Sequence, residues 1–131
     1  MSHLRVRPTD AELAILQVLW DQGPATVRQV HEALEARETG YTTTLKLMQI
    51  MAEKGLVSRD ESARTHVYTA KYTRDETQQR LVTDLLDRAF GGSAAALVMQ
   101  VLSSQQASAE ELRDIEQLIA DFKDTKGVVN D

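Results

Sequence analysis

The segment from Tyr41 to Val57 constrains the fold more strongly than any other part of this chain. Wound at about 100° per residue, it gathers apolar residues and one threonine on a single arc, which we expect to face a core. That arc comprises Thr44, Leu47, Met48 and Met51. Gly55 is expected to end the helix, and a strand-like run begins at Leu56. The segment therefore predicts a helix with a hairpin directly behind it, as in a DNA-recognition helix and its wing.

The opposite arc of this predicted helix is polar. It carries Thr42, Lys46, Gln49 and Glu53, with Thr43 beside it. Hydroxyl, amide and ammonium groups are the kinds that reach phosphates and base edges, so we expect Thr42, Thr43, Lys46 and Gln49 to contact DNA. Two plainer interpretations stay open: one of the threonines caps the helix, or Lys46 and Gln49 are solvated surface.

Composition narrows the classes of protein that fit this pattern. A length of 131 residues allows one ordinary domain, or a small domain with an appendage. Aromatic residues are only 5% of the chain, which favours helices over a β-sandwich. The lack of cysteine excludes disulfides and thiolate metal sites, and His3, His31 and His66 are too dispersed to indicate a metal cluster. No catalytic spacing or phosphate loop occurs, so we expect no cofactor, no metal and no enzymatic activity.

The two parts of the chain differ in charge. Residues 1–72 carry nine basic and nine acidic residues, whereas residues 73–131 carry six basic and eleven acidic ones. All of the net charge of −5 therefore lies in the second part. Phosphate binding needs a local positive footprint rather than a basic chain, so this charge does not exclude nucleic acid. A neutral first part predicts moderate affinity per subunit, which makes dimerisation useful.

Two helices are expected before the central segment. The first begins at the capping box Thr9–Glu12, and the second begins at the capping box Thr26–Gln29 and ends near residues 37–40. Two short helices joined by a small turn are typical of a helix-turn-helix. Arg28, in the first turn of the second helix, is expected either to meet a phosphate or to pair with Glu32.

The run from Leu56 to Tyr72 predicts the hairpin. β-formers are enriched on both sides of a polar tip at residues 60–65. We expect Arg59, Arg64 and His66 to contact the DNA backbone from the wing. For Arg64 a plainer interpretation stays open, since a charge at a hairpin tip often serves only solubility.

Three further helices are expected in the second part of the chain, beginning at the capping box Thr73–Glu76. Three helices bury little core by themselves, so their apolar stripes need a partner, and a second copy of the chain is the simplest one. We expect a homodimer held by Leu81, Leu85, Phe90, Leu97, Val98, Val101, Leu112, Ile115 and Ile119. The predicted fold is mainly α: a winged helix-turn-helix DNA-binding domain at 1–72, a helical dimerisation domain at 73–124 and a disordered tail at 125–131.

Several stretches, read together, connect the chain to a known family. They are Ala11–Trp20, Tyr41–Leu45, Glu53–Val57, Val67-Tyr68, Phe90–Ser93 and Leu97-Val98. In their order and spacing, from about Leu4 to Lys123, the chain resembles the penicillinase-repressor family (BlaI/MecI, with the copper-responsive CopY branch). The resemblance implies a winged-helix repressor that binds a palindromic operator as a homodimer through its C-terminal helices. It also implies that Thr42, Thr43, Lys46 and Gln49 enter or border the major groove.

The same resemblance implies how repression would be relieved. In many members a membrane-bound sensor metalloprotease cuts the short helix after the Gly-Gly break. There Gln100 and Val101 stand in place of the usual asparagine–phenylalanine pair and are the candidate cleavage site. Ile50 stands where the family often has an arginine, so a phosphate or base contact is missing there, or Ile50 touches a thymine methyl instead. The cysteine pairs of the copper branch are absent.

Two other functions fit the same pattern. One is a winged-helix module that docks a protein, and the other is a regulator with a ligand pocket between its domains. Salt dependence separates DNA binding from apolar docking, because only the former weakens steeply as salt rises. No apolar run approaches the roughly 20 residues of a transmembrane helix and no signal pattern opens the chain, so we expect a cytoplasmic protein.

Overall fold

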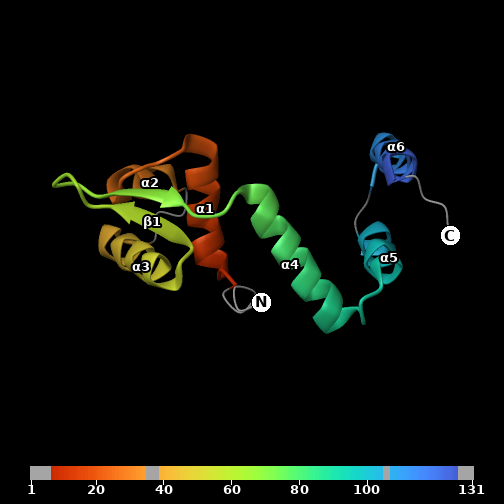
Figure 1. Ribbon diagram of the computed structural model, residues 1–131, viewed down its shortest axis with the longest axis horizontal. Helices are drawn as coiled ribbons and strands as arrows, with labels where there is room; N and C mark the ends of the chain where they lie inside the picture. The colour runs from red at the N-terminus through yellow and green to blue at the C-terminus, as the bar shows by residue number, and fades with distance from the viewer. Residues whose placement is uncertain (1–6, 35–38, 105–106, 127–131) are drawn as a thin grey trace. The chain divides into compact units, whose positions relative to one another are not determined.

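The computed structural model describes residues 7–34, 39–104 and 107–126. Within these residues the chain forms six helices and one two-stranded sheet (Figure 1). In chain order they are α1 (Asp10–Gln22), α2 (Val27–Ala33), α3 (Tyr41–Lys54), β1 (Val57–Asp60), β2 (Val67–Ala70), α4 (Arg74–Ala89), α5 (Ala94–Ser104) and α6 (Ala109–Lys126). This order confirms the predicted winged helix followed by further helices. The chain divides into two compact units, Met1–Leu85 and Leu86–Asp131.

Local hydrogen bonds start α1 and α2 where the capping boxes predicted. The Thr9 N–H donates to Glu12 Oε1 at 2.9 Å, and the Glu12 N–H donates to Thr9 Oγ1 at 3.2 Å. Thr26 and Gln29 make the same reciprocal pair at the start of α2. α2 is shorter than predicted, because Leu34 adopts an extended backbone and ends the helix after Ala33. Residues 35–38 lie outside the described residues.

α3 begins at Tyr41 behind Gly40, which offers no side-chain cap. Thr42 and Thr43 are exposed and neither occupies the N-cap position, so the capping interpretation of these threonines is wrong. The helix ends as predicted at Gly55, whose φ of +83° is in the left-handed region that favours glycine.

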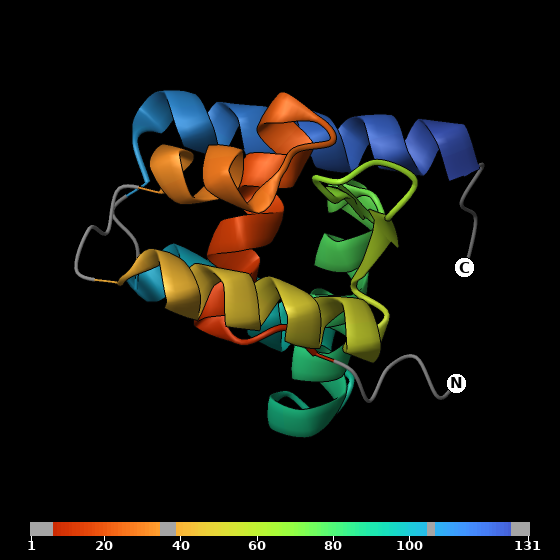
Figure 2. The same cartoon turned by 90° about the vertical axis from the view of Figure 1, so that its left-hand side faces the viewer.

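The core of the N-terminal unit lies between α1, α2, α3 and the hairpin. In Figure 2, α3 runs across the view below α2, with the hairpin beside them. Thr44, Met48 and Met51 of α3 are fully buried, whereas Leu47, predicted on the same arc, is only half-buried and packs against the core. The buried apolar residues are Ile15, Leu16, Leu19, Ala25, Val27, Val30, Met48, Met51, Leu56, Val57 and Tyr68.

The wing, β1 and β2 with the tip between them, forms an antiparallel hairpin with Arg59 opposite Tyr68. A third backbone segment joins it. Ala25 and Tyr68 exchange two N–H···O=C bonds of 3.0 and 2.8 Å, so the loop before α2 pairs with β2. This pairing, which the sequence pattern does not predict, fixes the first turn of α2 beside the wing.

The first part of α4 is attached to the N-terminal unit. The Trp20 indole N–H donates to the Tyr72 carbonyl at 3.0 Å, the Arg74 guanidinium lies 5.5 Å from the Trp20 ring centre, and Arg7 forms an ion pair with Asp84 at 3.2 Å. These contacts are the reason that the two units divide inside α4 rather than at residue 72, where the sequence pattern changes.

The second unit contains α5 and α6. Gly91 and Gly92, both at positive φ, separate α5 from α4, and the Ser93 hydroxyl accepts a bond of 3.0 Å from the Ala96 N–H. α5 buries none of its residues. α6 continues to Lys126, two residues into the segment predicted as a tail. Among the described residues no single helix is long and apolar enough to cross a bilayer; only α4 and α5 taken together across their break reach that length and composition.

Candidate nucleic-acid interface

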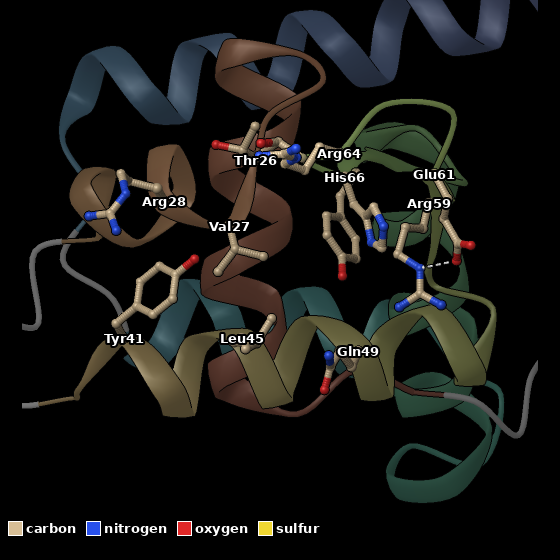
Figure 3. Close-up of a pocket in the computed structure, with 12 residues that line it drawn as sticks. Thr26, Val27, Arg28, Tyr41, Leu45, Gln49, Arg59, Glu61, Arg64 and His66 are labelled. Atoms are coloured by element: carbon tan, nitrogen blue, oxygen red, sulfur yellow. Dashed lines mark hydrogen bonds and ion pairs between the residues drawn. The ribbon is translucent and has the colours of Figure 1, made fainter.

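A groove of about 740 Å³ lies between α3, the start of α2 and the wing (Figure 3). We refer to it as the α3–wing groove. Its lining residues are Thr26, Val27, Arg28, Tyr41, Leu45, Gln49, Arg59, Glu61, Arg64, Thr65, His66 and Tyr68.

α3 contributes one stripe to this groove. Tyr41, Leu45 and Gln49 follow one another along the helix at intervals of four residues, and Figure 3 shows all three on the side facing the groove. Residues four apart share a helix face, so this spacing was present in the sequence. Gln49 was predicted as a contact residue, whereas Tyr41 and Leu45 were not among the predicted contact residues.

The wing and α2 contribute the positive charge. Arg28 comes from the first turn of α2, Arg59 from β1 and Arg64 from the tip, and all three line the groove with His66. The fold thus brings together cations that are far apart in the sequence.

Arg28 does not pair with Glu32, an interpretation that the sequence left open; within the described residues its guanidinium lies 5.1 Å from the Tyr41 ring centre. The other side of this contact is held by His31, whose ring meets Tyr41 edge-on at 5.8 Å. His31 Nδ1 also hydrogen-bonds the buried Thr44 hydroxyl at 2.9 Å. These contacts join α2 to α3 and hold the mouth of the groove in shape.

Arg59 forms an ion pair inside the groove. Its Nε donates to Glu61 Oε2 at 2.7 Å. Hydrogen bonding to the Tyr68 side chain, followed by the bond to Glu61, raises the pKa of Arg59 above its usual value. With three arginines and one glutamate, the groove carries a local positive charge in a chain whose net charge is −5.

The remaining predicted contact residues lie outside the groove on α3. Thr42, Thr43 and Lys46 are exposed, and Ile50, at 37% exposed, is among the exposed large apolar side chains. The predicted set is therefore divided: Arg28, Gln49, Arg59 and Arg64 line the groove, and the other three lie on the exposed surface of the same helix.

A second, apolar groove of about 470 Å³ occurs in the C-terminal unit. It is lined by Val98, Ile115, Leu118, Ile119, Phe122 and Lys123. Val98, Ile115 and Ile119 belong to the predicted dimer set, while Leu118 and Phe122, at 65% and 66% exposed, were not in it. The other predicted dimer residues are exposed (Leu85, Val101 and Leu112) or half-buried (Leu81, Phe90 and Leu97).

Gln100 and Val101 lie on α5 and are both exposed. In the described part of the chain, no group of histidine, aspartate and glutamate side chains is placed to hold a metal ion.

Comparison with known proteins agrees with this geometry. Residues 8–121 match the sequence profile of the family described as penicillinase repressor. The chain belongs to the penicillinase repressor family. It is 37% identical over 118 residues to the "Transcriptional regulator BlaI" of two strains of Mycobacterium tuberculosis, covering 87% of this chain and 83% of that protein. It is 24% identical over 119 residues to the "Penicillinase repressor" of Bacillus licheniformis, covering 90% and 93% of the two chains.

Family membership confirms the expected class of protein. The chain is a transcriptional repressor of the penicillinase repressor family and not an enzyme.

Proposed function

We propose that this repressor binds operator DNA as a homodimer, with α3 of each subunit in the major groove and each wing at the adjacent backbone. The observation that supports this most is the α3–wing groove, where Arg28, Arg59 and Arg64 converge between a helix and a hairpin. Local positive charge in an acidic chain is the footprint that phosphate binding needs.

The geometry of B-DNA identifies which part of the duplex would lie in the α3–wing groove. The major groove admits an α-helix, and one sugar–phosphate strand separates it from the neighbouring minor groove. If α3 enters the major groove and the wing reaches toward the minor groove, the sugar–phosphate strand must pass between α3 and the wing. The α3–wing groove is the space between those two elements, so its arginines would bind the phosphates of that strand.

In this arrangement, the exposed side of α3 contacts the bases. We propose that Thr42, Thr43, Lys46 and Gln49 contact base edges or the bordering phosphates, and that Ile50 packs against a thymine methyl. Gln49 lies at the border between this surface and the groove, because it lines the groove while its neighbours on the exposed side do not.

Lys46→Ala and Gln49→Ala test this proposal. Loss of one base or phosphate contact should cost about 1–3 kcal/mol of operator binding, which is roughly 5- to 160-fold in affinity. Fluorescence anisotropy with a duplex from the promoter just upstream of the gene, at fixed salt, measures the change. Lys71→Ala is the matched control, because Lys71 is exposed and does not line the groove. If both α3 variants bind as tightly as the wild type, α3 is not the reading helix; binding that does not weaken as salt rises would favour protein docking.

We further propose that the C-terminal unit forms the dimer and that cutting it relieves repression. The apolar groove between α5 and α6 is the exposed surface that a second copy would cover. Cleavage between Gln100 and Val101 would separate α6 from the rest of the subunit and so remove one side of this groove. A membrane-bound sensor metalloprotease is the proposed partner for that step, and mass spectrometry of the repressor recovered from induced cells would locate the cut.

A further inference from the structure

Glu61 is an acidic residue inside a groove that is otherwise suited to bind a polyanion. It follows β1 directly, lines the α3–wing groove and pairs with Arg59 at 2.7 Å (Figure 3, dashed line). Its side chain is 53% exposed, so it can swing away from Arg59 without unfolding the wing.

The neighbouring acid, Asp60, has a structural role that Glu61 lacks. Asp60 Oδ1 accepts a bond of 2.9 Å from the Ser62 N–H, which shapes the tip of the hairpin. Within the described part of the chain, Glu61 bonds only Arg59. The Arg59–Glu61 pair is exposed and contributes little to folding. The main consequence of the pair is that Glu61 occupies a hydrogen-bond donor of the Arg59 guanidinium.

A phosphate and the Glu61 carboxylate need the same donor. Both are oxyanions that accept from a guanidinium, so a phosphate that enters the groove must compete with Glu61 for Arg59. The groove has three arginines against one glutamate, and removing the glutamate raises its formal charge from +2 to +3 with His66 neutral.

We propose that Glu61 sets the affinity of the α3–wing groove for the DNA backbone, by holding the Arg59 guanidinium until a phosphodiester displaces it. This inference rests on the proposed function, since it assumes that the groove binds DNA. Glu61 would lower the affinity for a duplex of any sequence, because the sugar–phosphate backbone is the same in all sequences.

The test is Glu61→Gln in the full chain, which removes the charge and keeps the size. The probe is a labelled 30-base-pair duplex of mixed sequence, titrated by fluorescence anisotropy at several salt concentrations. We expect Glu61→Gln to bind about three- to tenfold more tightly at low salt, with a salt slope steeper by up to about one. Asp75→Asn is the charge-matched control: Asp75 is exposed on α4 and does not line the groove, so its gain should stay below about twofold.

Arg59→Gln distinguishes displacement from a general charge effect. If Glu61 acts through Arg59, the gain from Glu61→Gln should fall to that of Asp75→Asn once Arg59 is replaced. A gain that persists in the Arg59→Gln background would overturn the proposal, and so would unchanged or weaker binding by Glu61→Gln alone. A wild-type protein that binds no duplex even at low salt would instead contradict the proposed function, on which this inference depends.

Discussion

Glu12 carries a carboxylate into the interior of the N-terminal unit. Its side chain is only 3% exposed, yet its oxygens are satisfied from two directions. The Thr9 N–H bonds Oε1, and Lys54 Nζ lies 2.9 Å from both Oε1 and Oε2. Lys54 is also in the last turn of α3, where a cation is favourable. One residue thus caps α1 and connects it to the far end of α3.

Lys54→Met should therefore destabilise the protein. It leaves the buried carboxylate without its counter-ion, and because Lys54 is one-third exposed we expect a loss of about 1–3 kcal/mol in the free energy of unfolding. Urea unfolding followed by the fluorescence of Trp20, the single tryptophan of the chain, reports on this unit. Lys71→Met, at an exposed position, should change the free energy by less than about 0.5 kcal/mol. Equal values for the two variants would mean that the Glu12–Lys54 pair does not stabilise the fold.

Among the elements, α3 has its ends set by two glycines with different backbones. Gly40 precedes the helix at a φ of −75°, which any residue adopts, whereas Gly55 follows it at +83°. Space is not the limit at either position, since a Cβ would meet no atom within 4 Å. Conformation alone therefore distinguishes them, and the end of α3 determines where the wing begins.

Gly55→Ala should cost about 1–2 kcal/mol of unfolding free energy, because an L-residue pays for the left-handed conformation. Gly40→Ala should stay within about 0.5 kcal/mol, since the weaker N-cap preference for alanine is offset by lower entropy of its unfolded chain. Thermal unfolding of both variants, monitored by circular dichroism, makes the comparison. A Gly40→Ala loss as large as that of Gly55→Ala would contradict the assignment of the cost to backbone conformation.

At the scale of the whole molecule, the proposed function requires the winged-helix domains of two subunits to bind one operator together. Binding at the second half-site becomes intramolecular once the first is occupied, so operator affinity should depend steeply on dimerisation. Among the large apolar side chains in the described part of the C-terminal unit, Leu118 and Phe122 have the highest exposed fractions, and both line the apolar groove.

Leu118→Asp should weaken the dimer by about tenfold or more, because it removes roughly 1.5–3 kcal/mol of apolar burial and introduces a charge. Sedimentation velocity gives the oligomeric state, and operator titration should show a parallel loss. Ala120→Asp adds the same charge at an exposed position of α6 that does not line the groove, and it should leave the dimer intact. A chain that ends at Gln100, which reproduces the proposed cleavage product, should be monomeric with weak operator affinity. A Leu118→Asp protein that sediments as the wild type does would exclude this groove as the dimer interface.

Short-range patterns in the sequence were enough to predict most of the helices and strands. Hydroxyl and glutamate or glutamine residues three apart started α1 and α2, a glycine ended α3, and alternation around a polar tip predicted the wing. Each of these depends on hydrogen bonds or dihedral angles within about four residues, which a sequence displays directly.

Only the tertiary structure decided which distant side chains meet. Lys54 bonds Glu12 across 42 residues, Ala25 joins the wing through Tyr68, and Glu61 enters the same groove as three arginines. Such pairs are selected by the packing of whole helices, and no periodicity along the chain encodes them. For that reason the sequence alone was enough to predict α3 and the wing, whereas the groove that brings the three arginines together, and the pairing of one of them with Glu61, exist only in the folded protein.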